Sequence, residues 1–238
     1  MNFKFNNQTS DYLQVEDSFE IPVFPYEVDF HETEHSNTRI KKRGTFRPLE
    51  FDVPFNLYNN QNKTDRDTVL REVTKLLSSG VGWFSLDDAD WQVYGQFTGP
   101  FYVPKHINVF TVITLKFVSP YSFKFSKEET VLTGSTITIP NTSFVPVTPY
   151  IELTELTSND VQVSVAGDEF RRIRLSGTVP ALLTIDIPNE RIYETNSEVD
   201  KIDLLHLDSS YEDFKVKSGD IVVVNNGTMK IKYRELML

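Results

Sequence analysis

One stretch of the chain, residues 49–123, most constrains the fold because strand and helix signals follow one another there in a fixed order. It opens with strict alternation of apolar and polar residues from Leu49 to Leu57, which predicts a strand with one buried face. Pro54 interrupts the polar positions and has no N–H group, so we expect this strand at a sheet edge or at a bulge.

The next signal predicts a single helix. Thr64 or Asp65 can cap its first turn. Apolar residues then recur at the spacing of one helix face, namely Val69, Leu70, Val73, Leu76 and Leu77. Gly80 follows the last of them, where a left-handed cap favours glycine. We therefore expect a helix that packs its apolar stripe on a sheet and buries Leu70, Val73 and Leu77.

Beyond the helix the sequence returns to strands. Residues 83–94 predict a strand, an acidic turn at 87–90, and a second strand. A long alternating strand follows over residues 107–117 and ends in an aromatic–x–x–Pro–Tyr–x–aromatic segment, Phe117 to Phe123. This part of the chain is thus expected to contain a hairpin followed by a long strand.

The order of these elements resembles the N-terminal half of siphophage distal tail proteins, which form the ring joining the tail tube to the tail tip of long-tailed phages. In that family a strand, one amphipathic helix, a hairpin with an acidic turn and a long strand follow one another. The second half of the chain also resembles that family, whose members often carry a C-terminal galectin-like sandwich. The matching segments there are Pro149–Leu153, Leu183–Asp186 and Gly219.

Composition agrees with a mainly β protein. The 238 residues include 18 Phe and 10 Tyr, and Val, Ile and Thr dominate the remaining apolar runs, which favours strands. A Thr-, Ser- and Pro-rich stretch over residues 130–148 predicts a domain boundary near residue 130. We expect an N-terminal β-sandwich or β-barrel-like domain with one α-helix over residues 1–130. Residues 131–238 are expected to form a β-sandwich, and the resemblance to distal tail proteins implies that this sandwich is galectin-like.

Turn signals separate the short strands of the second half. Asn226-Gly227 between two apolar runs is a typical hairpin signal and predicts that residues 221–224 and 229–233 pair with each other. Many short strands at this spacing are typical of a β-sandwich.

Charge and cysteine content exclude several classes of function. The net charge of −10 argues against DNA or RNA as a partner, because phosphate contacts need a cationic face. The chain has no Cys, which excludes disulfides and thiolate metal sites. No signal peptide and no apolar run of about 20 residues is present, so we expect no membrane partner and synthesis in a host cytoplasm.

The charges are unevenly distributed near the N-terminus. Eight acidic residues and no Lys or Arg lie between Asp11 and Glu34. A basic cluster follows, made of Arg39, Lys41, Lys42, Arg43 and Arg47. One interpretation is a solvated hairpin whose charges neutralise each other. The other is a pair of complementary surfaces, with the basic cluster contacting a neighbouring subunit in head-to-tail fashion.

One catalytic pattern is present but its surroundings do not support it. The segment His31 to His35 matches H-E-x-x-H, whose chemistry requires both His on one face of a helix. The preceding residues alternate as a strand does, and in a strand the two His would stand about 13 Å apart. We expect a polar strand end or loop, with a pH-sensitive contact as a minor alternative.

No other motif in the sequence supports catalysis or metal binding. The acidic turn at 87–90 lacks the Gly and Glu of a calcium loop, and no nucleotide-binding or nucleophile motif occurs. We expect no catalytic residue, no cofactor, no metal and no enzymatic activity.

A carbohydrate-binding module is the alternative function. In it, Tyr193, Tyr211 and Phe214 would contact host cell-wall glycans. The simpler interpretation packs these rings in the core, and both Trp residues lie in the first half, where they cannot serve a galectin-like sandwich.

The resemblance implies a structural function in a phage or prophage of a Gram-positive host. It implies a homo-hexameric ring that joins the tail tube to the tail tip or baseplate hub. The implied partners are further copies of the chain, the tail-tube protein and a tail-tip hub or tail-associated protein, with a receptor-binding protein as a further candidate. The implied location is the tail tip of the virion, after assembly in the host cytoplasm.

Overall fold

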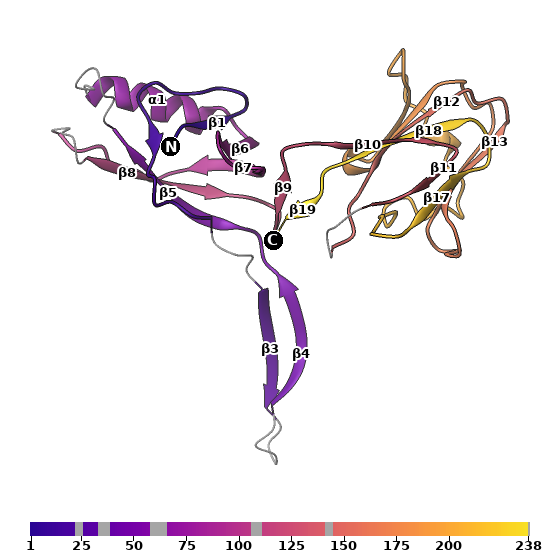
Figure 1. Ribbon diagram of the computed structural model, residues 1–238, viewed down its shortest axis with the longest axis horizontal. Coiled ribbons are helices and arrows are strands. Elements are labelled where there is room, and N and C mark those ends of the chain that lie inside the picture. The colour runs from indigo at the N-terminus through magenta and orange to yellow at the C-terminus, as the bar shows by residue number, and fades with distance from the viewer. Residues whose placement is uncertain (22–25, 33–38, 58–65, 106–110, 141–144, 238) are drawn as a thin grey trace. The chain divides into compact units, whose positions relative to one another are not determined.

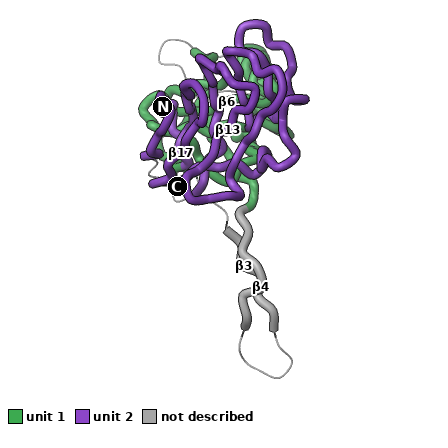
Figure 2. Tube along the Cα trace, turned by 90° about the vertical axis from the view of Figure 1, so that its right-hand side faces the viewer, with its two compact units in different colours: residues 1–125, 237–238 green, residues 126–236 purple. Residues whose placement is uncertain are grey.

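The computed structural model describes residues 1–21, 26–32, 39–57, 66–105, 111–140 and 145–237, and of residues 26–32 and 39–46 the backbone alone (Figure 1). Strands dominate and one α-helix is present in these residues, which confirms the mainly β fold. The chain forms two compact units: unit 1 is Met1–Phe125 with Met237–Leu238, and unit 2 is Ser126–Leu236 (Figure 2). The boundary between Phe125 and Ser126 lies close to the domain boundary expected near residue 130. The last two residues belong to unit 1, which the expected range 131–238 did not allow.

Unit 1 is built on one antiparallel sheet. Its strand order is β1 (Phe3–Phe5), β6 (Gly82–Leu86), β7 (Trp91–Thr98), β8 (Val112–Val118), β5 (Glu50–Asn56) and β2 (Gln14–Val15). The same sheet includes β9 (Lys124–Ser126), which pairs with β7 and with β19 (Leu236–Met237). The acidic turn joins β6 to β7, so the expected hairpin is confirmed. The long strand begins at Val112, and residues 107–110 of its expected range lie outside the described residues.

The alternating segment forms β5, with Phe51, Val53 and Phe55 buried as expected. Strand β2 pairs with only two residues of β5, Phe55 and Asn56. Pro54 is the next residue along β5, and its carbonyl accepts a hydrogen bond of 3.0 Å from the backbone of Glu16. The proline ring is tolerated because this side of β5 uses the carbonyl of Pro54 and needs no N–H there. Strand β2 lies outside β5 and the pairing of β5 with β8 has no register shift, so the expected position at a sheet edge or a bulge was wrong.

The helix α1 (Arg66–Ser78) forms as expected, and Gly80 has the left-handed φ of +71°. Its buried residues are Val69, Val73 and Leu76. Leu70 and Leu77 are only half-buried, so the expected burial of these two was wrong. Each lies one position, about 100°, further round the helix than a buried neighbour, which places it at the flank of the stripe. The two candidate capping residues, Thr64 and Asp65, lie outside the described residues.

Aromatic rings fill the core of unit 1. Phe97 and Phe117 meet edge to face with ring centroids 5.0 Å apart, and Phe3 meets Phe55 at the same distance. Gly95 makes room for this packing, because a Cβ there would stand 2.6 Å from the Phe117 ring and 2.3 Å from the Val118 carbonyl oxygen. The core is thus matched in shape to a glycine in the adjoining strand.

Unit 2 is a sandwich of two antiparallel sheets around one apolar core. The five-stranded sheet has the order β10 (Thr130–Gly134), β18 (Thr228–Tyr233), β12 (Tyr150–Thr154), β15 (Leu183–Asp186) and β16 (Arg191–Glu194). The four-stranded sheet has the order β11 (Thr136–Thr138), β17 (Ile221–Val224), β13 (Asp160–Val165) and β14 (Arg172–Ser176). Two short 3-10 helices, η1 (Ile187–Asn189) and η2 (Ile202–Leu204), follow strands β15 and β16.

The hairpin expected at Asn226-Gly227 is wrong. Gly227 does adopt a turn conformation with φ of +80°, but β17 and β18 belong to different sheets. The two Asn side chains bind backbone instead: Asn225 accepts from the Gln162 N–H at 2.7 Å and Asn226 from that of Thr157 at 2.8 Å. The turn therefore carries the chain from one sheet to the other, held by side chains rather than by a ladder.

Strands β3 (Tyr26–Glu32) and β4 (Arg39–Phe46) form a separate two-stranded antiparallel ribbon. Its register shifts once, between Asp29 and Phe30. Neither strand pairs with any other described strand, so the ribbon has two open edges within the described part of the chain.

Candidate functional surfaces

The ribbon brings the acidic and basic segments of the N-terminal region together. Its register places Asp29 opposite Arg43 and Glu32 opposite Arg39. Lys41 lies opposite Phe30, and Lys42 falls at the register shift without an opposite residue. Arg47 lies just beyond β4 and is exposed. The backbone thus pairs two of the five basic positions with acidic ones, as in the solvated-hairpin interpretation, and contacts of the cluster with a neighbouring subunit stay a prediction.

The H-E-x-x-H pattern begins in this ribbon. His31 belongs to strand β3, opposite Ile40, so it does not lie on the helix that zinc-protease chemistry requires. His35 lies outside the described residues. In the part of the chain that the structure describes, no group of three or more His, Cys, Asp or Glu side chains is placed to hold a metal ion. Nor is any described helix long and apolar enough to cross a membrane.

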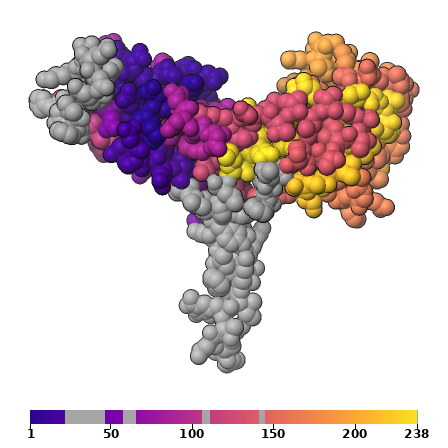
Figure 3. All heavy atoms as spheres, in the orientation of Figure 1, coloured from indigo at the N-terminus to yellow at the C-terminus, as the bar shows by residue number. Residues whose placement is uncertain are grey.

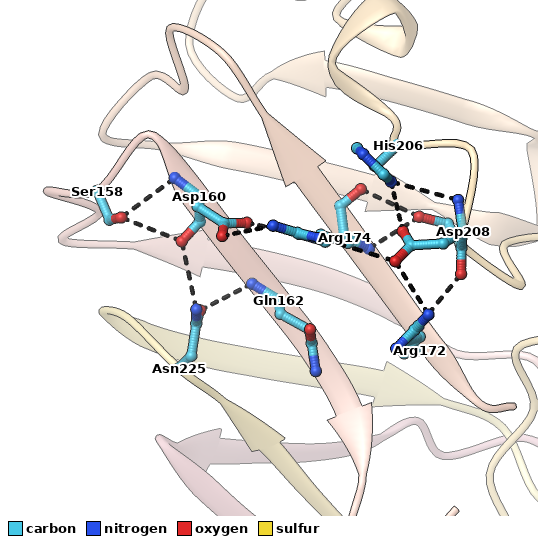
Figure 4. Close-up of polar contacts among 9 residues, drawn as sticks. Ser158, Asp160, Gln162, Arg172, Arg174, His206, Asp208 and Asn225 are labelled. Atoms are coloured by element: carbon cyan, nitrogen blue, oxygen red, sulfur yellow. Dashed lines mark hydrogen bonds and ion pairs between the residues drawn. The ribbon is translucent and has the colours of Figure 1, made fainter. Parts of the chain in front are cut away.

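A charged network lies on the outer face of the four-stranded sheet in unit 2 (Figure 4). Arg174 makes a two-pronged ion pair with Asp160, with both N–O distances 2.9 Å. Asp208 joins the network through Arg172 Nη2 at 2.9 Å and His206 Nδ1 at 2.5 Å. Arg172 and Arg174 are two positions apart on β14 and so point to the same face.

The network shifts the acidity of its carboxylates. The hydrogen bond from Arg174 lowers the pKa of Asp160. Desolvation opposes the same effect at Asp208, but the bond from His206 and the charges of Arg172 and Arg174 lower its pKa on balance. Both carboxylates therefore stay ionised and paired at neutral pH, which suits a structural contact and leaves no free acid for proton transfer.

The network also fixes a segment that covers the edge of β14. The Ser209 hydroxyl accepts from the backbone N–H of Arg174 at 2.9 Å and donates to its carbonyl at 3.0 Å. Ser210 makes the same pair of bonds to Arg172, at 3.0 and 3.1 Å. Residues 205–210 thereby satisfy an edge that would otherwise be open. Sequence reasoning missed this cover, because two adjacent serines have no local signature of such a role.

Two of the three candidate glycan contacts are not available. Phe214 is fully buried and Tyr211 is 7 % exposed, so neither ring can stack on a sugar, and both pack in the core as the simpler interpretation has it. The Tyr211 hydroxyl donates to the Asp186 carbonyl at 3.1 Å, and burial raises its pKa to about 12. The Tyr211 ring can pack in the core because a partner for its hydroxyl exists there.

Tyr193 is half-buried on the outer face of the five-stranded sheet. Its hydroxyl lies 3.0 Å from that of Tyr150, a bond that raises the pKa of Tyr193 to about 12. The Arg191 guanidinium lies 4.9 Å from the centroid of the Tyr193 ring. One face of that ring is therefore already occupied by a cation.

Taken as a whole, the chain has the fold of distal tail (Dit) proteins of siphophages. It is similar to the crystal structure of the Dit protein of phage SPP1, described as a paradigm of the hub adsorption apparatus of phages that infect Gram-positive bacteria. The TM-score is 0.80 at 14 % identity, over 100 % of this chain and 99 % of that chain.

Structures of the phage p2 baseplate in its activated conformation are similar too. With calcium the TM-score is 0.56 at 9 % identity, over 98 % of this chain and 90 % of that one. With strontium it is 0.53 at 9 % identity, over 97 % and 90 %. No protein-family model and no curated protein matches the sequence. The resemblance that the order of sequence signals indicated is thus confirmed at the level of the fold.

Proposed function

We propose that this chain is a structural subunit of a phage tail tip, and that six copies close into a ring that joins the tail tube to the tip or baseplate hub. The observation that carries the proposal is the extent of the likeness to SPP1 Dit, which covers 100 % of this chain and 99 % of that one. Both units, their order and their connection are included in it. A role of this kind needs no catalytic step and no cofactor.

The ribbon β3–β4 supports the assembly part of the proposal. An isolated two-stranded ribbon is marginally stable in water, so a neighbour that pairs with or packs on it would stabilise it. Lys41 and Lys42 have no acidic residue opposite them in the register and are the basic positions best suited to an acidic neighbour. Contacts of one face of a subunit with a different face of the next can close into a ring.

Apolar burial would supply most of the binding free energy of such a ring, since obligate interfaces are large and apolar. The charges would set orientation and association rate. The partners of the ring would be the tail-tube protein on one face and a hub or tail-associated protein on the other, with a receptor-binding protein as a further candidate. The location would be the tail tip of the virion, reached after assembly in the host cytoplasm.

The mass of the purified full-length protein tests this proposal. Sedimentation velocity should show a species with six times the 27.5 kDa mass of one chain, and electron microscopy should show closed rings. Addition of the cognate tail-tube protein should stabilise the ring if it forms only weakly alone. A protein that stays monomeric in both conditions would contradict the ring. A monomer that binds cell-wall glycans, and loses binding on Tyr193→Ala, would instead support the carbohydrate-binding alternative.

A further inference from the structure

The edges of the unit 2 sandwich differ in how they are protected. An edge strand exposes a row of unpaired N–H and C=O groups, which proteins normally cover, shorten, charge or interrupt with proline. The edge of β14 is covered by residues 205–210, as described above. The edge of β16 is covered by residues 199–201, through bonds from Glu194 N to the Val199 carbonyl at 2.9 Å and from Lys201 N to the Ile192 carbonyl at 2.7 Å. Strand β11 is only 3 residues long.

Strand β10 has none of these protections in the part of the chain that the structure describes. Its five residues, Thr-Val-Leu-Thr-Gly, include no charge and no proline. It pairs with β18 on one side, and no hydrogen bond from the described residues reaches its other side. Val131 is 46 % exposed, and Leu132 is only partly buried against the core. The strand lies at the end of the five-stranded sheet in Figure 1, and atoms of this region lie at the surface in Figure 3.

We propose that the open edge of β10 is a docking site for an extended segment of another protein chain, which adds to the five-stranded sheet as a sixth strand. The row of main-chain groups determines the chemistry of the occupant, since only another peptide backbone matches its alternating donors and acceptors. Pockets for alternate side chains then give such strand addition its specificity.

The neighbours of β10 define the side chains of that segment. An apolar residue that faces the core beside Leu132 would complete the burial of this side chain. Glu128 and Glu129 are exposed immediately before β10, so a Lys or Arg at the adjacent end of the segment would be favoured. The occupant is therefore an uncharged, β-branched run of about five residues with a cation at one end.

A second copy of this chain fits the edge less well. Pairing of β10 with the β10 of a second copy would bring no cation to Glu128 and Glu129, since residues 130–138 include no Lys or Arg. A five-residue contact also falls far short of the roughly 1,200 Å² that a stable interface buries. A segment of a different chain avoids both difficulties, because other contacts in an assembly would hold it close to β10. The inference concerns unit 2 alone and does not depend on ring formation.

A library of random peptides about ten residues long, displayed for selection against the full-length protein, tests the proposal. We expect selected peptides to contain an alternating β-branched run without central proline. Their binding should slow hydrogen exchange of β10 amides at least several-fold, while exchange in the covered edges β14 and β16 stays unchanged. Val131→Pro should abolish binding by removing an N–H and the extended pairing geometry.

A second variant distinguishes a loss of peptide binding from a loss of stability. If Val131→Pro lowers the melting temperature, the double variant Val131→Lys/Thr133→Lys takes its place, since edge lysines oppose strand addition without removing β10–β18 bonds. Three results would overturn the proposal: no peptide selected above background, selected peptides that leave β10 exchange unchanged, or protection of β10 by self-association of the protein alone.

Discussion

The guanidinium of Arg171 makes a two-pronged ion pair with the carboxylate of Asp220, one of two buried aspartates among the described residues of this chain. Nη2 of Arg171 donates to Oδ1 of Asp220 at 3.1 Å while Nη1 donates to Oδ2. Asp220 is 7 % exposed and also accepts from the backbone of Lys217 at 2.9 Å. Arg171 binds Asp168 as well, through Nε at 2.7 Å. The pair ties the β13–β14 turn to the start of β17.

Removal of Arg171 should therefore destabilise unit 2. Arg171→Leu leaves the Asp220 charge buried without its cation, and we expect a loss of about 2–4 kcal/mol in the free energy of unfolding. Urea unfolding followed by near-UV circular dichroism measures it. The matched control is Arg172→Leu, the next residue, whose partner Asp208 is more exposed and whose loss should cost much less. Equal losses in the two variants would contradict the special role of the buried pair.

Alkaline pH should destabilise the protein through Tyr211. Its folded-state pKa, about 12, lies above the ordinary value of 10, because burial disfavours the phenolate. A raised pKa means that the stabilisation is fully present below pH 10 and is lost as pH rises from 10 through 12. We expect the free energy of unfolding to fall across this window by about 2 kcal/mol or less from this group.

The variant Tyr211→Phe isolates that effect. It should unfold with a smaller loss of stability between pH 10 and pH 12 than the wild type, because the ring stays buried without an ionisable group. An ultraviolet titration of the folded protein should show at least two tyrosines, Tyr211 and Tyr193, that ionise near pH 12. Ionisation of all ten tyrosines near pH 10 would show that neither side chain is held as described.

The docking of helix α1 is tested at Val73, which is fully buried. Val73→Asp places an unpaired charge in the middle of the apolar stripe and should prevent folding of unit 1. Thr74→Asp is the matched control, since Thr74 is the next residue along the helix and is exposed. Thermal unfolding of the two variants gives the comparison. If Val73→Asp melts like the wild type, the helix does not pack on the sheet through this residue.

The basic positions of the ribbon are tested by charge reversal. Lys41→Glu/Lys42→Glu/Arg43→Glu should weaken or slow assembly at low salt, because the charges are proposed to orient a neighbouring subunit. The difference in assembly between the variant and the wild type should become smaller at high salt, because salt screens exposed charges. Sedimentation at both salt concentrations measures it. Unchanged assembly at low salt would confine the cluster to a solvated face and leave apolar burial as the whole driving force.

Local periodicity made several elements predictable. The period-2 pattern of residues 49–57 and the 3.6-residue pattern of residues 69–77 are properties of the backbone geometry itself, so β5 and α1 formed where the sequence indicated. Gly80 and the acidic turn between β6 and β7 are local signals of the same kind. Their order along the chain was enough to indicate the fold that the comparison with SPP1 Dit confirms.

Partners distant in sequence decided the rest. The sequence left open whether Tyr211 and Phe214 lie at the surface or in the core, and a core assembled from both sheets of unit 2 buries them. Asn226-Gly227 turns the chain into the other sheet, because bonds to Gln162 and Thr157 replace the ladder of a hairpin. The open edge of β10 is likewise invisible in its own sequence, since an edge is defined by the absence of a neighbouring strand among the described residues. Sequence thus determined the elements of this protein, and long-range packing alone decided which faces and edges they expose, because burial depends on what the rest of the chain places beside them.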